Sequence, residues 1–287
     1  MSDRVLVTGA TGFIGRSVTA RLTSDGVAFT GLGSADGDVA DRATLGRLKG
    51  GKYARVVHLA GRSFVPDSWT DTAGFMRTNV GGTESVLEFC RESGAALVFV
   101  SGYVYGSSKR QPIREDTPPN PNNPYARSKY LAENSCRSCH ERHGVPVTVL
   151  RPFNVYGPGQ GPRFLVPSIL RQVRDGSAIE VHDLAPRRDW VYVDDVAAAI
   201  VAAARGPRGF EVYNIGSGAS TSVEELIRRI QAVCGTALPV RVIGRPRDNE
   251  IADTVADIAK ARRELGWSPA TALDEGLRRC VLELEKT

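Results

Sequence analysis

Residues 8–15, TGATGFIG, constrain the fold of this chain more than any other part of its sequence. They follow a short apolar run and open a stretch with amphipathic helical spacing, which predicts a strand, a tight turn and a helix. Glycines at positions 9, 12 and 15 let the backbone turn sharply and approach a pyrophosphate at the helix N-terminus. A glycine-rich turn without a ligand is the alternative, but the strand before it and the helix after it favour a dinucleotide-binding site.

Short β-branched runs alternate with helical stretches through the first half of the chain. The predicted buried strands are residues 5–7, 27–29, 56–59, 97–100 and 148–150. Between them, residues 82–93 place Val86, Leu87 and Phe89 on one helix face. This alternation predicts right-handed crossovers and a parallel sheet that is covered on both faces. The predicted fold class is α/β, a Rossmann-type doubly wound parallel sheet with a smaller α/β substrate-binding lobe.

The regular alternation ends after Arg151, where a loop rich in proline and glycine follows. Asp195 is expected to cap the helix in the second part of residues 189–204, which begin as a strand. Ser222 and Glu225 have the spacing of a capping box. Further helices are predicted over about 165–174 and over 221–233.

Two domains are predicted from this change of pattern. The dinucleotide-binding domain comprises residues 1–162 and about 188–216, and the substrate-binding lobe comprises residues 163–187 and 217–287. The lobe is expected to close over the carboxyl ends of the strands, which places the active site in the cleft between the two parts.

Tyr125 and Lys129 form a YxxxK motif at the start of a predicted helix. A spacing of four places the phenol and the ammonium on one helix face, and the positive charge is expected to lower the pKa of the phenol. Tyr125 is therefore predicted to act as a general acid or base. Ser101 stands at the carboxyl end of the predicted strand 97–100, where ligands meet an open parallel sheet. The alternative for the motif alone is a solvated helix face.

Composition and charge limit the expected cellular location and the class of ligand. No stretch approaches the roughly 18 consecutive apolar residues that a membrane span needs, so no membrane association is expected. The first residues pass directly into a strand, which leaves no room for a secretory leader, and five sparse cysteines do not suit a disulfide framework. A cytoplasmic location is therefore expected. The net charge of +5 comes from scattered Lys and Arg, which argues against nucleic acid and suits an anionic substrate.

Eight motifs are spread over nearly the whole chain. They are TGATGFIG at Thr8, HLAG at His58, TNVGGT at Thr78, VSGYVYG at Val100, YARSK at Tyr125, LRPFNVYGPGQ at Leu150, RRDWVYVDD at Arg187 and ELGWSP at Glu264. As a set they resemble the extended short-chain dehydrogenase/reductase family, specifically its NAD-dependent nucleotide-sugar epimerase/dehydratase group. The resemblance implies an NAD(P)-dependent enzyme that acts on a nucleotide-diphosphate sugar. It also implies homodimerisation through the helix that carries Lys129.

The resemblance implies roles at matching positions. Tyr125 would move the proton of the sugar hydroxyl, Ser101 would bond the reacting oxygen, and Lys129 would hold the nicotinamide ribose. The implied cofactor contacts are Gly9, Thr11, Gly12, Phe13, Ile14, Gly15, Asp38, Val39, Leu59, Ala60, Gly61, Asn79, Tyr125, Lys129 and Pro152. The implied substrate contacts are Ser63, Tyr103, Asn154, Leu165, Arg188 and Arg247. The planar fork of arginine suits the oxygens of a diphosphate. No metal ligands are expected.

Two departures from the pattern of the group bear on the reaction. Its 4,6-dehydratases carry an acid just after the catalytic Ser or Thr, because elimination of water across C5 and C6 needs an acid–base pair. Here Gly102 and Tyr103 follow Ser101, which disfavours a dehydratase. Residues 246–250 also differ from the Gly-Asp pattern usual in epimerases, which leaves the details of the diphosphate pocket open.

The leading prediction is an NAD(P)-dependent nucleotide-sugar 4-epimerase, which oxidises C4 transiently and returns the hydride to the other face. The alternative is an NADPH-dependent 4-reductase of a nucleotide 4-keto-6-deoxysugar. A third alternative is a non-catalytic dinucleotide-sensing module, against which the intact Ser101, Tyr125 and Lys129 argue. Residues 31–35, at the end of the second strand, contain neither an acid for the ribose of NAD nor an arginine for NADP. Both cofactors stay open, with NAD slightly favoured.

Two other features are given structural roles, and a third, Trp69, is kept as a candidate neighbour of the substrate. Cys136, Cys139 and His140 match a C-x-x-C-H haem-attachment pattern, but this helix face is expected to pack as core, where cysteine behaves as a small hydrophobe. His58 is expected to be a hydrogen-bonded residue inside the fold. Trp69 follows the third predicted strand closely enough to border the substrate.

Overall fold

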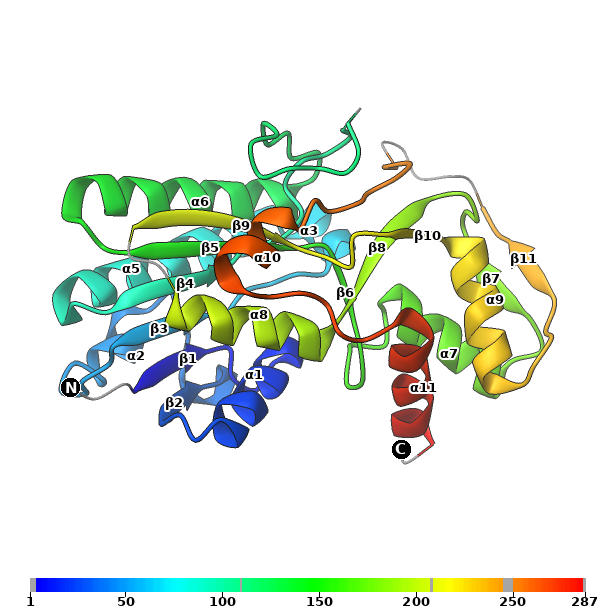
Figure 1. Cartoon of the computed structure of the whole chain (residues 1–287), viewed down its shortest axis with the longest axis horizontal. Coiled ribbons are helices and arrows are strands. Elements are labelled where there is room, and N and C mark those ends of the chain that lie inside the picture. Colours follow the sequence, from blue (N-terminus) through cyan, green and yellow to red (C-terminus); the bar gives the residue numbers. More distant parts are fainter. Residues whose placement is uncertain (1–3, 109, 207–208, 245–249, 286–287) are drawn as a thin grey trace.

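The structure is a computed structural model that describes residues 4–108, 110–206, 209–244 and 250–285. Its centre is a six-stranded parallel sheet with the order β2-β1-β3-β4-β5-β9 (Figure 1). The strands are β1 (Val5–Thr8), β2 (Phe29–Leu32), β3 (Arg55–His58), β4 (Ala96–Val100), β5 (Val147–Pro152) and β9 (Phe210–Ile215). The predicted Rossmann-type sheet is therefore confirmed. β2 begins later than predicted, and β9 is not among the predicted strands.

Helices cover both faces of this sheet, as the continuous burial of its central strands requires. Val5 and Val7 of β1 belong to a core that includes residues of α1 (Phe13–Ser24) and α8 (Val193–Arg205). Leu6 points to the other face, where α5 (Gly82–Ser93) and α6 (Pro124–His143) complete a second core. The buried strands therefore carry apolar residues on both sides, which explains their continuous apolar runs.

A smaller lobe lies at one end of the sheet (Figure 1). Its three-stranded sheet has the order β10-β8-β6, and a second sheet pairs β11 with β7. These strands are β6 (Asn154–Tyr156), β7 (Ile179–Val181), β8 (Arg187–Tyr192), β10 (Ser220–Ser222) and β11 (Val240–Val242). The helices α7 (Leu165–Asp175), α9 (Val223–Cys234) and α11 (Leu273–Leu284) contribute to a third apolar core in this lobe. The boundaries predicted for the two domains stay a prediction.

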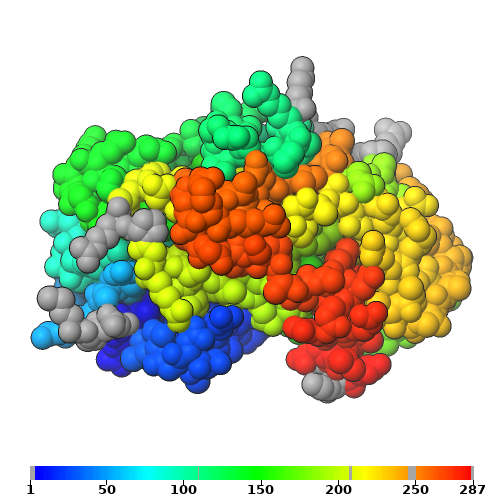
Figure 2. Space-filling model, in the orientation of Figure 1, coloured from blue at the N-terminus to red at the C-terminus, as the bar shows by residue number. Residues whose placement is uncertain are grey.

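Short elements complete the chain. They are η1 (Ser34–Asp36), α2 (Arg42–Gly46), α3 (Val65–Thr70), α4 (Thr72–Met76), the π-helical turn η2 (Arg77–Gly81) and α10 (Ala259–Leu265). Figure 2 shows that the C-terminal part of the chain, orange to red, lies across the face in view. Among the described residues, no helix combines the length and apolar character that a membrane crossing requires.

The two predicted helix caps have different outcomes. Ser222 caps α9 and forms the predicted capping box with Glu225, so that prediction is confirmed. The prediction that Asp195 caps α8 is wrong, because Tyr192 occupies the N-cap position. The Asp195 carboxylate instead accepts hydrogen bonds from the backbone nitrogens of Ala270 (3.1 Å) and Thr271 (3.0 Å). It thereby ties the segment before α11 to the start of α8.

Replacement of Asp195 by alanine should destabilise the protein, because two backbone donors lose their carboxylate acceptor. The expected loss in free energy of unfolding is about 2 kcal/mol, measured by urea denaturation. Asp194→Ala is the matched control, since the side chain of Asp194 is exposed in the same helical turn. Equal stability of the two variants would contradict this role of Asp195.

Candidate active site at the carboxyl edge of the sheet

The glycine loop between β1 and α1 has the geometry of an anion site. Gly9 has a φ of 71°, and an added Cβ would lie 2.7 Å from the backbone nitrogen of Ala60. A Cβ on Gly15 would lie 2.0 Å from the carbonyl oxygen of Gly9, so neither position tolerates a side chain. Gly12 is the N-cap of α1 and supplies no side-chain cap. The N–H groups of the first turn, at the predicted cofactor contacts Phe13 and Ile14, therefore suit a pyrophosphate.

The loops that follow the first three strands of the sheet are joined to one another. Ala10 N donates to the carbonyl oxygen of Leu32 at the end of β2 (2.9 Å). Leu59 N, just after β3, donates to the carbonyl oxygen of Thr8 (3.1 Å). The predicted cofactor contacts after β1 and β3 therefore lie along one edge of the sheet.

Gly61, Asn79 and Lys129 meet at this edge. A Cβ on Gly61 would lie 3.0 Å from Asn79 Oδ1 and 3.5 Å from Lys129 Nζ. Asn79 is itself fixed, since its Oδ1 accepts from Arg62 N (2.8 Å) and its Nδ2 donates to Ser128 Oγ (2.8 Å). The structure thus brings three predicted cofactor residues together, from the loop after β3, from η2 and from α6.

Ser101, Tyr125 and Lys129 come from the end of β4 and the first turns of α6. Asn123 caps α6 by accepting from Ala126 N (2.8 Å), which fixes the helical turn that carries Tyr125. Lys129 Nζ donates to the carbonyl oxygen of Val100, the residue before Ser101 (2.8 Å). Ser101 Oγ is buried and has no hydrogen-bond partner in the described chain. A buried hydroxyl without a partner fits a residue that bonds a ligand oxygen.

Burial controls the pKa values of Lys129 and Tyr125. It lowers the pKa of Lys129 to about 8, which the nearby Glu133 carboxylate partly opposes. Burial raises the pKa of Tyr125 to about 12. The expectation that Lys129 lowers the pKa of Tyr125 is therefore wrong for this structure. The reason is that loss of hydration dominates, while the ammonium is directed at the Val100 carbonyl and lies 4.9 Å from the centre of the Phe99 ring.

Gly102 leaves room for the Tyr125 hydroxyl. A Cβ at Gly102 would lie 2.5 Å from Tyr125 Oη, so the phenol stands directly against this backbone. The next residue, Tyr103, donates from its own hydroxyl to the carbonyl oxygen of Gly106 (2.6 Å) and packs edge-on against Phe153. Neither position places a carboxylate beside Tyr125.

The predicted substrate residues lie in both parts of the molecule. Asn154 begins β6 and is in register with Trp190, two residues beyond Arg188 on β8. Arg188 donates to the carbonyl oxygen of Ile251 (2.6 Å) and forms an ion pair with Glu250. Two further predicted substrate residues lie at element boundaries, Ser63 before α3 and Leu165 at the start of α7, and the predicted cofactor contact Pro152 ends β5. Arg247 lies outside the described residues.

Two of the predicted cofactor contacts, Asp38 and Val39, lie after η1. Val39 is buried, and Asp38 Oδ1 accepts from Ala40 N (2.9 Å). Asp38 also forms an ion pair with Arg77, and the Ala40 hydrogen bond and this arginine hold the pKa of its carboxyl below the usual range. The carboxylate is therefore charged and oriented at neutral pH.

Two residues at the site are absent from the sequence predictions. Asp36 Oδ2 accepts from Gly33 N at the end of β2 (2.7 Å), one residue beyond the 31–35 window in which the acid is sought. Glu250 is the partner of Arg188, and its only sequence signal is an acid within residues 246–250. The Asp36 contact is local, three residues from Gly33, and lies just outside the window, whereas the Glu250 contact joins residues 62 positions apart, for which no local pattern exists.

His58 and Cys136, which are predicted to have structural roles, both lie in the interior of the protein. His58 bonds the hydroxyls of Thr8 (2.7 Å) and Thr83 (3.2 Å), and burial lowers its pKa to about 3, so it is a neutral residue of the interior. Cys136 is completely buried in the core shared by α5 and α6. Across the described part of the chain, no group of three or more His, Cys, Asp or Glu side chains is arranged to hold a metal ion. Trp69 on α3 is exposed.

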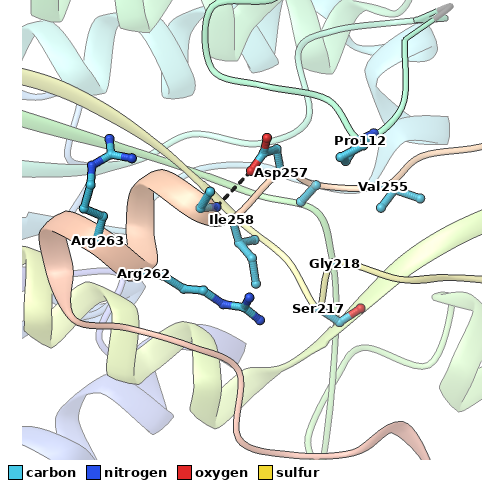
Figure 3. Close-up of a pocket in the computed structure, with 10 residues that line it drawn as sticks. Pro112, Ser217, Gly218, Val255, Asp257, Ile258, Arg262 and Arg263 are labelled. Atoms are coloured by element: carbon cyan, nitrogen blue, oxygen red, sulfur yellow. Dashed lines mark hydrogen bonds between the residues drawn. The ribbon is translucent and has the colours of Figure 1, made fainter.

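A surface pocket of about 600 Å³ lies apart from these residues (Figure 3). Pro112, Ser217 and Ile258 are among its lining residues, and the side chains of Arg262 and Arg263 point to different sides of it. None of its lining residues belongs to the predicted catalytic, cofactor or substrate set.

Comparison with known proteins identifies the family of this chain. Residues 5–216 match the model of the NAD dependent epimerase/dehydratase family. The chain belongs to this family. A dTDP-glucose 4,6-dehydratase of Streptomyces griseus is 34% identical, over 98% of this chain and 94% of the relative. A GDP-6-deoxy-D-mannose reductase of Pseudomonas aeruginosa is 32% identical, over 99% and 98%.

Solved structures of family members match the whole fold. The RMD structure from Pseudomonas aeruginosa, complexed with NADPH, has a TM-score of 0.92 and 30% identity, covering 99% of both chains. The UDP-glucose 4-epimerase of Thermotoga maritima, with UDP-glucose, has a TM-score of 0.90 and 29% identity, again over 99% of both chains. The predictions of this family, of its fold and of an enzyme that uses NAD or NADP are confirmed. The roles of individual site residues stay predictions.

Replacement of Lys129 by methionine should stabilise the cofactor-free protein at pH 7, by roughly 2 kcal/mol, since a buried charge is removed. The folded pKa of about 8 lies below the ordinary value of 10.5, so between these values the unfolded chain binds more protons. The wild type is therefore less stable than Lys129→Met by the full amount below pH 8, and this difference becomes smaller as the pH rises toward 10.5.

Denaturant unfolding at several pH values measures this difference. Arg127→Met is the control, because it removes a positive charge from an exposed position of the same helix. A Lys129→Met variant that is less stable than wild type at pH 7, or a difference that does not change with pH, would contradict the account.

Proposed function

We propose that this enzyme transfers a hydride at C4 of a nucleotide-diphosphate sugar without eliminating water, and that it acts as a 4-epimerase. The observation that carries the proposal is the close approach of Gly102 to the Tyr125 hydroxyl, where a Cβ would lie only 2.5 Å away. Neither Gly102 nor Tyr103 supplies the acid that elimination across C5 and C6 needs. The dehydratase relative therefore shares the fold of this chain but not the reaction proposed for it.

Each catalytic residue has a physical reason for its proposed role. A bound nicotinamide dinucleotide supplies or accepts the hydride. Tyr125 gives a proton to O4 of the sugar or takes one from it, and Ser101, whose buried Oγ has no partner among the described residues, bonds the same oxygen. Lys129 holds its positive charge at the carboxyl end of β4, where it favours negative charge on the reacting oxygens.

The smaller lobe is proposed to bind the nucleotide and diphosphate of the substrate. Arg188, Asn154 and Arg247 are the proposed diphosphate and sugar contacts, and the larger sheet is proposed to bind the cofactor. UDP-glucose in the Thermotoga maritima epimerase supports a nucleotide sugar as the ligand class. Homodimerisation through α6 stays part of the proposal.

A second candidate is an NADPH-dependent 4-reductase of a nucleotide 4-keto-6-deoxysugar, and the end of β2 favours it. Here the carboxylate of Asp36 turns back onto Gly33 N (2.7 Å). Arg47 Nη2 donates to the carbonyl oxygen of Asp36 (2.5 Å). A carboxylate engaged in this way is less available to the ribose hydroxyls of NAD, and an arginine at this turn suits the extra phosphate of NADP. The P. aeruginosa structure with NADPH is consistent with this candidate.

The two candidates differ in how they use the cofactor. A 4-epimerase should interconvert two nucleotide sugars, seen by NMR, with catalytic cofactor and no net change in reduced nicotinamide. A 4-reductase should consume NADPH in equal amount to the alcohol formed from a nucleotide 4-keto-6-deoxysugar.

Tyr125→Phe is the control for both assays. It should abolish turnover and leave dinucleotide affinity within about twofold, because only the proton-transferring hydroxyl is lost. A non-catalytic sensor would give no turnover with the wild type either. Turnover that survives Tyr125→Phe, or formation of a 4-keto-6-deoxysugar from a hexose nucleotide, would contradict the proposed function.

A further inference from the structure

Arg188 is already neutralised by a residue of its own chain. Its side chain is 16% exposed and forms an ion pair with Glu250, whose side chain is 26% exposed. The other nitrogen of the fork, Nη1, donates to the carbonyl oxygens of Arg187 (2.8 Å) and Ile251 (2.6 Å). Three of the five N–H donors of the guanidinium are thus engaged, two from Nη1 with backbone carbonyls and one from Nη2 with the Glu250 carboxylate.

The surroundings of Arg188 add a second negative charge. Burial lowers the pKa of Arg188, while Glu250, Tyr103 and Asp253 oppose that change electrostatically. Asp253 Oδ1 is buried and has no hydrogen-bond partner among the described residues. A phosphate that approaches Arg188 therefore meets one carboxylate bound to the arginine and another close by. Repulsion from two carboxylates reduces the attraction that the arginine offers.

The backbone that follows Glu250 is hydrogen-bonded to β8 at Ile251 and Ala252, so release of Arg188 concerns the side chain of Glu250. Arg187 N donates to the carbonyl oxygen of Ala252 (2.8 Å), which ties this segment to β8. Figure 1 shows the segment, in orange, beside β8 and before α10. Glu250 lies two residues from this tie and outside any helix or strand. Rotation of its side chain frees the Nη2 donor and leaves the backbone hydrogen bonds of the arginine in place.

We propose that Glu250 is an internal competitor for the diphosphate of the substrate. Its carboxylate occupies Arg188 until a diphosphate takes its place, so it sets the affinity and rejects ligands with less phosphate charge. This inference rests on the proposed assignment of Arg188 to the diphosphate. A ligand phosphate must displace the Glu250 carboxylate from Arg188, and this displacement uses part of the binding free energy. A strongly charged diphosphate can supply that free energy better than a weakly charged ligand, so the ion pair discriminates between them.

Titration calorimetry of the full chain tests the proposal without any assay of turnover. The probes are uridine, thymidine and guanosine diphosphates, each compared with its monophosphate. Glu250→Gln should bind the diphosphates about tenfold more tightly than wild type, because the competing charge is gone. The variant should gain more affinity for the monophosphates than for the diphosphates, so that the ratio of the two affinities becomes smaller.

Three further variants make the result specific. Glu275→Gln removes a charge from an exposed ion pair with Arg279 in the same lobe and should leave the affinities unchanged. Glu250→Asp, with a shorter side chain, should fall between wild type and Glu250→Gln. Arg188→Gln should weaken diphosphate binding at least tenfold.

Two results would overturn the inference in different ways. In the first, Glu250→Gln binds the diphosphates no more tightly than wild type, while Arg188→Gln still weakens their binding. Glu250 would then be a residue that positions Arg188, and the proposed function would stand. Absence of diphosphate binding by wild type and by Glu250→Gln would overturn both the inference and the substrate class of the proposed function. Circular dichroism of each variant excludes loss of fold as the cause.

Discussion

The buried ammonium of Lys129 is the interaction on which the catalytic edge depends. It is taken out of water and held by the carbonyl oxygen of Val100 at the end of β4 (2.8 Å). Gly61, in the loop after β3, lies beside it, since a Cβ there would be 3.5 Å from Lys129 Nζ, and the same glycine lies against the amide of Asn79 from η2. A charge in this position is costly for the folded protein, and the depressed pKa of Lys129 expresses that cost. The protein thus keeps a positive charge where negative charge is proposed to develop on a sugar oxygen.

A buried ion pair between Glu133 and Arg151 holds the helix that carries this lysine. Glu133 lies one turn beyond Lys129 on α6 and accepts from Arg151 of β5 through both carboxylate oxygens (3.0 and 3.2 Å from Nε). Arg151 also donates to the hydroxyl of Tyr105 (2.8 Å), which in turn donates to Asn214 of β9 (2.6 Å). This network joins α6 to β5 and β9 beneath the site. The position of the ammonium is therefore set by the sheet as well as by the helix.

The sequence predicts those features whose signals are local. The glycine loop, the strands β1 to β5 and the spacing of Tyr125 and Lys129 each depend on residues within a few positions of one another, and the structure has them. The ion pair of Arg188 with Glu250 joins residues 62 positions apart, so no local pattern indicates it. The pKa of Tyr125 likewise follows from burial, which depends on how distant segments pack around it. The strands β6, β7, β10 and β11 of the smaller lobe are missed because three residues carry too little periodicity.

The central claim is that the site moves a hydride at C4 and leaves the bond between C5 and its hydrogen intact, because no acid stands beside Tyr125 at positions 102 and 103. The most direct measurement is turnover of an accepted nucleotide sugar in deuterium oxide, followed by NMR of the product. The account predicts that no solvent deuterium enters C5. Deuterium at C5 would mean that the C5 proton is removed during turnover, as elimination requires, and would contradict the account.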